Sequence, residues 1–357
     1  MSGGFSDIVM TAETNGQGFC RIRKIPVKAC FRREGTSVKI AVLDAATLGD
    51  DLSLLPLEAT GEVTVYRTTK PDEVAGRIRN VDAVVINKIR LNETNLAGSK
   101  VKLICVAATG YDNIDIGWCG KHNIAVCNVV GYSTDSVAQL TVAMVLYLAQ
   151  HMAEYTRFVR EGEYSKSGIA NRLTPAFHEL SGKTWGIAGY GNIGKKVGAA
   201  AEALGCRVIV YKRSPVQDAV CVDLETLCRE SDILSVHLPL NNETRGLFSR
   251  DQIALMKPDA LFINVARGAV TDEQALADAV MGKRIGGIGI DVYSEEPFTE
   301  NHPFYAIRMD NRVCLTPHMA WGAYEARERC IREIADNIMA FRNGKLRNCV
   351  NAESISL

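Results

Sequence analysis

The sequence predicts an α/β protein built from two doubly wound parallel-sheet domains. Three observations lead to this class. Short apolar runs alternate with helical segments along most of the chain, which is typical of a parallel sheet with crossover helices. A second series of the same kind begins near residue 185, after a long helix. The 357 residues are enough for two domains with separate cores.

The first series follows an N-terminal extension. Residues 1–37 are rich in glycine and polar residues and then become locally basic, so we expect them to be poorly ordered. Beyond them, a polar helix is expected at 72–79. The strands expected in this part of the chain lie at 38–43, 63–66, 83–86 and 103–107.

A long helix is expected from Ser133 to His151, with Ser133 or Thr134 as its N-cap. Apolar side chains cover nearly every face of this helix, which is typical of a buried helix, here one between the two domains. Residues 157–179 are polar and irregular, and we expect a surface or subunit-contact segment there.

The second series contains a helix at 192–204, and a final amphipathic helix is expected at 323–341. Its strands are expected at 185–188, 207–211, 233–238, 261–265, 288–292 and 313–315. Because the last helix follows the whole series, we expect the chain to return there to the first domain. The first domain then comprises residues 38–138 and 322–350, and the second comprises residues 139–321.

The composition excludes several classes of function. A formal net charge of zero gives no support for a nucleic-acid partner. The eleven cysteines contain no Cys-x-x-Cys pair, so we interpret them as reduced thiols of a cytosolic protein rather than zinc ligands or a disulfide framework. No apolar stretch approaches the ~20 residues of a membrane-spanning helix, and the N-terminus lacks the pattern of a signal peptide.

A glycine-rich turn opens the second series. The run Gly189-Tyr190-Gly191-Asn192-Ile193-Gly194 fits Gly-x-Gly-x-x-Gly, with an apolar strand before it and a helix after it. The first glycine permits a tight turn, the second lets a diphosphate approach the backbone, and the third lets helix and strand pack closely. The free amides at the helix N-terminus then hold the diphosphate. In this context the turn predicts dinucleotide binding in a Rossmann domain.

The next strand ends in Lys212, Arg213 and Ser214. A NAD enzyme usually has a carboxylate near this position, which accepts hydrogen bonds from the ribose 2′-hydroxyl. Two cations and a hydroxyl favour a 2′-phosphate instead, through charge-assisted hydrogen bonds. The sequence therefore predicts that NADP(H) is preferred and that NAD(H) is possible, although a solvated basic turn would look the same.

Polar residues also follow three further strands, where ligands of open α/β sheets bind. These segments are Ile263–Gly268, Asp291–Pro297 and Leu315–His318. Each has an ordinary structural explanation when taken alone. Together, a cation such as Arg267 can hold a carboxylate, an imidazolium such as His318 can protonate an alkoxide, and Glu296 can support that imidazolium. The set predicts hydride chemistry on a 2-oxo acid.

With these residues the chain resembles a known family, the D-isomer-specific 2-hydroxyacid dehydrogenases. It resembles most closely their glycerate dehydrogenase/hydroxypyruvate reductase branch. The resemblance runs from about Val38 to about Asn348. Besides the glycine turn and the three strand ends, it is carried by the segments at 108–115, 131–139 and 180–184. The spacings of 29 (296 − 267) and 22 (318 − 296) also look like the family's Arg–Glu–His order.

The resemblance implies roles for individual residues. Arg267 looks like the anchor for the substrate carboxylate and carbonyl, His318 like the acid/base, and Glu296 like the carboxylate that supports it. Asn87-Lys88-Ile89 matches a loop whose backbone amides meet the substrate carboxylate. Trp321 matches a side chain near the substrate. The implied fold is a Rossmann cofactor domain and a flavodoxin-like substrate domain with a cleft between them.

For the cofactor, Asp291 resembles the residue that holds the nicotinamide carboxamide. The other cofactor-lining positions are His237, Pro239, Thr244 and Ala266. Lys212 departs from the family, whose NAD-dependent members usually have Asp there. No metal is expected, because Arg267 and His318 supply the charge stabilisation.

The predicted reaction is reduction of a small 2-oxo acid, of the hydroxypyruvate or glyoxylate type, to the D-2-hydroxy acid, and the reverse. The predicted partners are this small molecule and a second copy of the chain, since family members are commonly dimers, with no nucleic acid and no membrane.

Some alternatives stay open. The substrate could be a larger 2-oxo acid, or the chain could be a non-catalytic dinucleotide-sensing protein like the corepressors related to this family. Formate dehydrogenases on this fold replace the Glu partner with Gln, and Glu296 argues against them.

Overall fold

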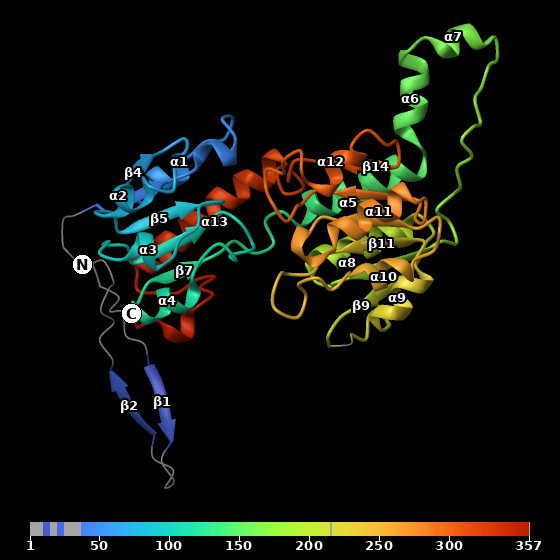
Figure 1. The fold of residues 1–357 in the computed structure, drawn as a ribbon. Coiled ribbons are helices and arrows are strands. Elements are labelled where there is room, and N and C mark those ends of the chain that lie inside the picture. Colours follow the sequence, from blue (N-terminus) through green and yellow to red (C-terminus); the bar gives the residue numbers. More distant parts are fainter. Residues whose placement is uncertain (1–9, 15–19, 25–36, 215, 357) are drawn as a thin grey trace, which may run out of the picture. The chain divides into compact units, whose positions relative to one another are not determined.

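The computed structural model describes residues 10–14, 20–24, 37–214 and 216–356. The chain divides into two compact units (Figure 1). Unit 1 consists of Met1–Val130 and Glu328–Leu357, and unit 2 consists of Gly131–Arg327. The predicted class, with two α/β domains each built on a parallel sheet, is confirmed.

The predicted disorder of residues 1–37 falls largely on residues outside the described part. Within that range, β1 (Met10–Thr14) and β2 (Cys20–Lys24) pair as antiparallel strands.

Unit 1 is built on a five-stranded parallel sheet with the order β4-β3-β5-β6-β7. Its strands are β3 (Lys39–Val42), β4 (Glu62–Val65), β5 (Ala83–Ile86), β6 (Leu103–Val106) and β7 (Ala125–Cys127). Every residue of β5 and β6 is buried, which explains why both strands are continuous apolar runs.

The helices that accompany this sheet are mostly short. They are η1 (Ala45–Leu48), α1 (Leu55–Glu58), α2 (Val74–Ile78), α3 (Glu93–Leu96), α4 (Ile116–Lys121), η3 (Ala352–Ser354) and most of α13 (Tyr324–Arg342). The long helix α13 brings the end of the chain back to unit 1, as its position in the sequence predicted.

Unit 2 is built on a seven-stranded parallel sheet with the order β10-β9-β8-β11-β12-β13-β14. Its strands are β8 (Thr184–Ala188), β9 (Arg207–Tyr211), β10 (Val220–Cys221), β11 (Ile233–Val236), β12 (Leu261–Asn264), β13 (Gly287–Ile290) and β14 (Val313–Leu315). The chain runs outward from β8 through β9 to β10 and then returns to β11 on the other side of β8. Ligands of open α/β sheets bind at the carboxyl ends of the strands beside such a reversal.

Most helices of unit 2 cover this sheet. They are α5 (Thr134–Ala149), α8 (Asn192–Ala203), α9 (Leu224–Glu230), α10 (Arg250–Ala254), η2 (Gly268–Val270), α11 (Glu273–Met281) and α12 (Pro303–Ile307). Two more, α6 (Met152–Arg160) and α7 (Glu163–Ser167), form an arm that projects from the unit (Figure 1). The buried face of α5 packs in one cluster with β8 and α8, and Met144 lies so close to Gly289 that a Cβ there would be 3.1 Å from the Met144 Cβ. This packing places α5 wholly in unit 2, whereas the sequence put a domain boundary inside it, at residue 138.

The segment after α5 differs from the sequence prediction. The helix ends at Ala149, and His151, with a φ of 48°, turns the chain into α6. Residues 157–179 were predicted to be irregular, which was wrong for the end of α6 and for α7. Met152, Tyr155 and Val159 have the three- and four-residue spacing of a helix face, and that signal was present in the sequence.

In the described part of the chain, no single helix has the length and apolar character needed to cross a membrane. The bent pair of α5 and α6, with an angle of 65° between them, has that length and composition only when the two helices are taken together.

Candidate active site

The glycine turn follows β8 at the point where the strand order reverses. Gly189 has a φ of 97°, and a Cβ there would lie 2.7 Å from the carbonyl oxygen of His237, just beyond β11. A Cβ on Gly194 would lie 2.2 Å from the carbonyl oxygen of Gly189. A Cβ on Gly191, in contrast, would meet no described atom within 4 Å. The turn is closely packed at Gly189 and Gly194 and open at Gly191. This pattern fits a diphosphate that approaches Gly191 and is held by the first amides of α8.

The other residues of the turn contribute mainly backbone. A Cβ on Gly198 of α8 would lie 3.3 Å from the Tyr190 ring, and the Lys195 ammonium lies 5.6 Å from the centre of that ring. The ring of Tyr190 therefore packs back onto α8. Asn192 and Ile193 form the first turn of α8, where helix geometry leaves amides without intrahelical partners.

The end of β9 carries the three polar residues that bear on cofactor choice. The Arg213 guanidinium forms a 2.8 Å ion pair with Glu243, and these side chains are 81% and 67% exposed. Ser214 is exposed and Lys212 is partly exposed. Within the described residues, Lys212 and Ser214 have no hydrogen bond or ion pair. Two of the three groups are therefore available to a ligand, and the third has a carboxylate partner that the sequence did not predict.

The loop after β11 contains the predicted positions His237, Pro239 and Thr244. Burial lowers the pKa of His237 to about 3, so this ring is neutral at pH 7. Its Nε2 lies 3.1 Å from the Ser235 hydroxyl, and its buried Nδ1 has no partner in the described part of the chain. The Thr244 hydroxyl donates to the Pro239 carbonyl at 2.6 Å, which folds the loop and presents Glu243 at its surface.

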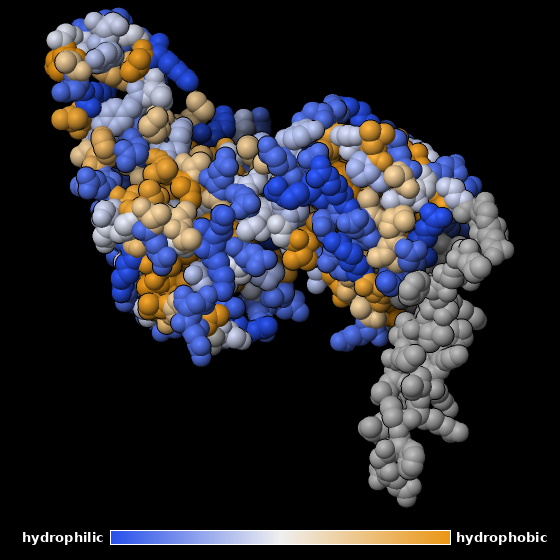
Figure 2. All heavy atoms as spheres, turned by 180° about the vertical axis from the view of Figure 1, so that it is seen from behind, coloured by the Kyte–Doolittle hydropathy of each residue, from blue (hydrophilic) through white to orange (hydrophobic). Residues whose placement is uncertain are grey.

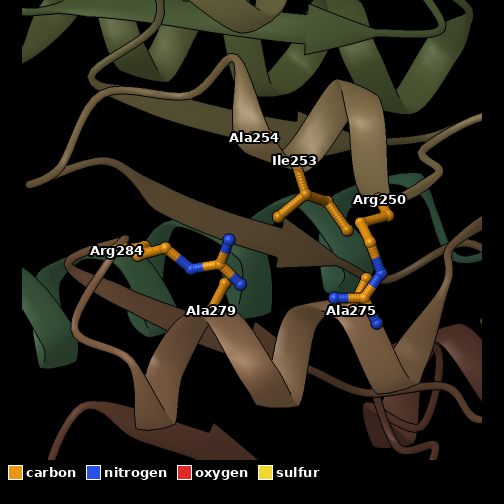
Figure 3. Close-up of a pocket in the computed structure, with 6 residues that line it drawn as sticks. All are labelled: Arg250, Ile253, Ala254, Ala275, Ala279 and Arg284. Atoms are coloured by element: carbon orange, nitrogen blue, oxygen red, sulfur yellow. The ribbon is translucent and has the colours of Figure 1, made fainter.

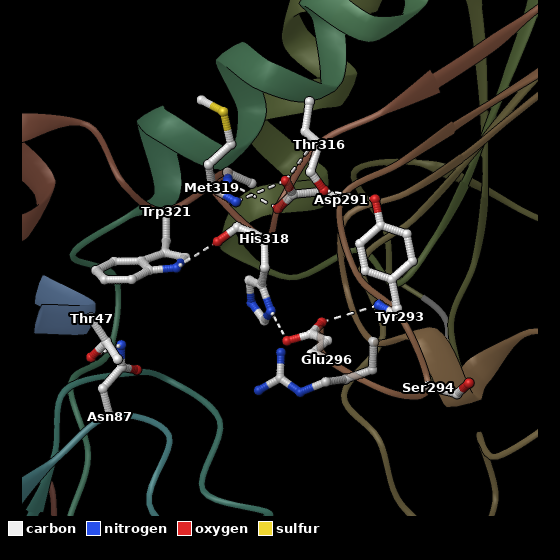
Figure 4. A network of polar contacts seen from close by, with 12 residues as sticks. Thr47, Asn87, Asp291, Tyr293, Ser294, Glu296, Thr316, His318, Met319 and Trp321 are labelled. Atoms are coloured by element: carbon white, nitrogen blue, oxygen red, sulfur yellow. Dashed lines mark hydrogen bonds and ion pairs between the residues drawn. The ribbon is translucent and has the colours of Figure 1, made fainter. Parts of the chain in front are cut away.

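The predicted acid/base pair is formed at the carboxyl ends of β13 and β14. The His318 Nδ1 lies 2.6 Å from the Glu296 Oε2, with both side chains partly buried (Figure 4). The other carboxylate oxygen of Glu296 accepts from the Tyr293 amide at 3.0 Å. His318 has a φ of 53°, in the left-handed region that residues other than glycine rarely adopt. Such a conformation persists where the surroundings hold it, often in a functional site.

Asp291 is the group that holds this turn. Its carboxylate accepts from the Thr316 hydroxyl at 2.6 Å, from the Met319 amide at 2.8 Å and from the Ala320 amide at 2.9 Å (Figure 4). The side chain is fully buried, and burial raises its pKa above the usual range. Asp291 therefore fixes the residues on both sides of His318, a role that the sequence did not predict.

Trp321 supports the same turn. Its indole Nε1 donates to the His318 carbonyl at 3.1 Å (Figure 4), and its ring meets the Tyr132 ring edge to face, with centres 6.4 Å apart.

Arg267 lies in the turn between β12 and η2. The Asn264 side chain shapes this turn by accepting from the Ala266 amide at 3.0 Å and donating to the Arg267 carbonyl at 3.0 Å. A Cβ on the next residue, Gly268, would lie 2.1 Å from the Tyr293 carbonyl carbon. Only glycine permits this contact, which brings the backbone after Arg267 against the segment that leads to Glu296.

A buried network behind this segment was missed from the sequence. The Glu273 carboxylate on α11 accepts from the Ser294 amide at 2.9 Å and from the Ser294 hydroxyl. It also lies 3.0 Å from the His302 Nε2, with both side chains nearly fully buried. Glu273 thereby anchors the loop two residues before Glu296. No local pattern marks such a contact, because its members come from three elements.

In unit 1, the predicted substrate-binding loop has an internal partner. The amides of Asn87, Lys88 and Ile89 all donate to Asp44, at 2.6–3.2 Å, and the Asn87 side chain donates to Thr47 at 3.0 Å (Figure 4). Asp44 is buried, and this burial raises its pKa. A carboxylate thus already occupies the amides that the resemblance assigned to the substrate.

A small surface hollow in unit 2 lies between α10 and α11 (Figure 3). It is lined by Arg250, Ile253, Ala254, Ala275, Ala279 and Arg284. Arg250 is paired with Asp278 at 2.7 Å. None of the predicted site residues lines this hollow, so it is separate from the candidate active site.

Comparison with known proteins agrees with this geometry. The family model for the "D-isomer specific 2-hydroxyacid dehydrogenase, NAD binding domain" matches residues 142–320. A glycerate dehydrogenase of Methylorubrum extorquens is 34% identical over 316 residues, covering 88% of this chain and 99% of that protein. A glyoxylate reductase of Thermococcus litoralis is 38% identical over 290 residues, covering 78% of this chain and 86% of that protein.

Two solved structures are similar over nearly their whole length. An acyclic imino acid reductase in complex with NADPH and D-Arg superposes with a TM-score of 0.77 at 28% identity, covering 88% of this chain and 100% of that one. A D-lactate dehydrogenase of Aquifex aeolicus, complexed with NAD and lactic acid, also has a TM-score of 0.77, at 26% identity, with coverages of 89% and 97%. The chain thus belongs to the D-isomer specific 2-hydroxyacid dehydrogenase family.

Proposed function

We propose that this protein reduces a small 2-oxo acid of the hydroxypyruvate or glyoxylate type to the D-2-hydroxy acid, and catalyses the reverse reaction. The observation that carries the proposal is the 2.6 Å contact between the His318 and Glu296 side chains at the carboxyl ends of β13 and β14. The similarity to a glycerate dehydrogenase and a glyoxylate reductase supports the choice of small substrates. We assign dinucleotide binding to unit 2 and substrate binding mainly to unit 1.

Two residues of unit 2 have different roles in the proposed reaction. Arg267 binds the substrate carboxylate and polarises the carbonyl, and protonated His318 donates its proton to the carbonyl oxygen. Because Glu296 contacts the Nδ1 of His318, the opposite ring nitrogen, Nε2, is the one that exchanges the proton with the substrate. When bound, the nicotinamide supplies the hydride that C2 of the acid receives. In the reverse direction His318 accepts the proton of the hydroxyl group.

The contacts of the substrate-side residues refine their proposed roles. Because Asp44 accepts from the amides of Asn87, Lys88 and Ile89, we assign this loop a substrate-binding role as a whole, with Asp44 fixing its shape. Trp321 binds near the substrate while its indole holds the carbonyl of His318.

For the cofactor, the proposal is that NADP(H) is preferred and NAD(H) is accepted. The available Lys212 and Ser214, together with Arg213, support binding of a 2′-phosphate. The contact with Glu243 counts against a strong preference, because a phosphate must compete with this carboxylate for Arg213. We keep His237, Pro239, Thr244, Ala266 and Asp291 as positions that line the cofactor.

The proposed assembly is a homodimer formed through the segment from α6 to residue 179. Apolar side chains are exposed along it, and Figure 2 shows them on the arm that projects from unit 2. The most exposed are Met152, Val159, Tyr164, Ile169, Leu173 and Phe177. A patch of this kind is typical of an interaction site. Sedimentation of the purified chain would give twice the monomer mass, and Leu173→Asp with Ile169→Asp would give the monomer.

The proposed location is the cytosol, as the scattered cysteines predicted.

The catalytic proposal is tested by steady-state reduction of hydroxypyruvate, glyoxylate, pyruvate and phenylpyruvate with NADPH. Fastest turnover with one of the first two acids is expected. Preference for phenylpyruvate would replace the small substrate with a larger one. Tight dinucleotide binding without turnover of any acid would favour the dinucleotide-sensing protein.

A further inference from the structure

The end of the chain forms an extra edge on the sheet of unit 1. After α13 it runs antiparallel to β7, with the Val350 amide donating to the Val126 carbonyl at 2.8 Å and the Asn128 amide to the Asn348 carbonyl at 3.1 Å. These two bonds flank the bridge that pairs Cys127 with Cys349. The two cysteines are therefore a non-hydrogen-bonded antiparallel pair, the kind whose side chains lie closest.

This register brings the two sulfur atoms together. The two side chains are close enough for the Cys127 thiol to donate a hydrogen bond to the Cys349 sulfur when Cys349 is a thiolate, whereas the neutral Cys349 thiol donates to the Asn351 Oδ1 at 3.3 Å. The Cα atoms of a non-hydrogen-bonded pair are about 4.5 Å apart, which lies within the range of about 4.4–6.8 Å that disulfides require. The pair can therefore be oxidised without rearrangement of either strand.

The two thiols differ in access. Cys127 is 1% exposed, whereas Cys349 is partly exposed beside it on the outer segment. A dissolved reagent can reach Cys349 first, and Cys127 lies directly behind it. This arrangement of an accessible thiol with a buried neighbour is typical of redox-sensitive cysteine pairs.

The surroundings also make Cys349 the more acidic thiol. The hydrogen bond from Cys127 lowers its pKa, and backbone amides of Asn351 and Val126 act in the same direction, while burial opposes them. In contrast, burial raises the pKa of Cys228 and Cys330 to about 12. The thiolate is the reactive form, so Cys349 reacts more readily than these buried thiols. In the described part of the chain, no group of three or more His, Cys, Asp or Glu residues is arranged to hold a metal ion.

We propose that Cys349 is a site of oxidative modification and that Cys127 resolves this modification into a disulfide. The oxidant is a low-molecular-weight disulfide such as oxidised glutathione. The Cys349 thiolate attacks one of its sulfurs, breaks the S–S bond and releases one thiolate, leaving a mixed disulfide. Cys127 then loses its proton to solvent and attacks the Cys349 sulfur, which releases the second thiolate. Two cysteine thiols are oxidised and one small disulfide is reduced to two thiols.

The bond would tie the last residues of the chain to the sheet. In the reduced protein this segment is held by polar contacts, chiefly the Asn351 side chain, which accepts from the Val126 amide at 2.9 Å and donates to the Ile124 carbonyl at 2.9 Å. A disulfide adds a covalent link one residue from Val126 on one strand and two residues from Asn351 on the other. We therefore expect carboxypeptidase digestion of the oxidised protein to stop at Cys349, whereas digestion of the reduced protein continues past this residue.

The test is to incubate the reduced full-length protein with oxidised glutathione and to follow intact mass and peptide maps. The wild type is expected to lose about 2 Da, with a disulfide joining the peptides of Cys127 and Cys349. Cys127→Ser is expected to stop at the mixed disulfide, about 305 Da heavier, on Cys349. Cys228→Ser, at a buried thiol in unit 2, is the matched control and is expected to behave as the wild type.

A stable adduct on Cys349 in the wild type, or a Cys127→Ser variant without an adduct on Cys349, would overturn the proposal. A second measurement does not depend on the folding of any variant. A brief pulse of dilute iodoacetamide on the native wild type should label Cys349 on the order of tenfold faster than the buried thiols Cys228 and Cys330. Equal labelling of Cys349 and Cys228 would contradict the accessibility on which the proposal rests.

Discussion

The end of β9 and the ends of β12 to β14 are both at the carboxyl edge of the same sheet, and they are built in opposite ways. At β13 and β14, Asp291 is fully buried and three donors bond to it, so buried contacts hold the turn that carries His318. At β9, Lys212 and Arg213 are on a partly exposed turn, and the only described ion pair there is between two mostly exposed side chains. The chemistry is therefore fixed by buried contacts with the backbone, whereas cofactor choice depends on solvated charges that one substitution can change.

The largest effect is expected at His318. His318→Gln removes the proton donor but keeps a polar side chain of similar reach, so kcat should fall by about 10²–10⁴ while dinucleotide affinity stays nearly unchanged. The kinetics of acid reduction and a fluorescence titration with NADPH measure the two quantities. His122→Gln, at an exposed histidine of unit 1, is the matched control. Unchanged turnover in His318→Gln would remove this residue from the mechanism.

The next largest effect is expected at Glu273. Glu273→Ala leaves the Ser294 amide and His302 without their buried partner, at a cost of about 2–4 kcal/mol in the free energy of unfolding. Because the Ser294 loop leads to Glu296, kcat should fall as well. Urea unfolding and kinetics measure the two effects. Asp278→Ala, at a partly exposed carboxylate on the same helix, is the control and should cost less than about 1 kcal/mol. Equal losses of stability would show that the buried network does not anchor this loop.

A smaller effect is expected at Glu296. Glu296→Gln replaces the carboxylate 2.6 Å from the His318 Nδ1 with a neutral amide, so the ring loses its anionic partner. The carboxylate holds the ring in the orientation for proton transfer, so kcat should fall about 10–100-fold with dinucleotide affinity nearly unchanged. Steady-state kinetics and a fluorescence titration with NADPH measure the two quantities. Turnover equal to that of the wild type would disprove the pairing.

The smallest effects are expected at the end of β9. Lys212→Ala should lower kcat/KM for NADPH about tenfold with little change for NADH. Glu243→Gln releases Arg213 from its carboxylate partner and should raise kcat/KM for NADPH a few-fold. Glu225→Gln, at an exposed carboxylate paired with Arg229, is the control. A loss of NADPH efficiency in Glu243→Gln would mean that this ion pair orders the site instead of competing for it.

The comparison also explains what could be predicted from the sequence. The six expected strands of unit 2 and the glycine turn were found within one or two residues, because apolar runs and local steric demands determine them. The contact between Glu296 and His318 followed from family spacing. Three other contacts could not be predicted from the sequence. They join Asp44 to the amides of 87–89, Glu273 to Ser294, and Glu243 to Arg213. Each joins residues 21 or more positions apart through side chains, and no local pattern encodes such a pair.

Reduction of hydroxypyruvate by the wild-type protein, followed by chiral analysis of the product, tests the central claim most directly. Membership of the D-isomer specific family predicts that D-glycerate accumulates at the rate at which NADPH is consumed. Formation of L-glycerate, or no reduction at all under conditions where NADPH binds, would contradict the proposed function.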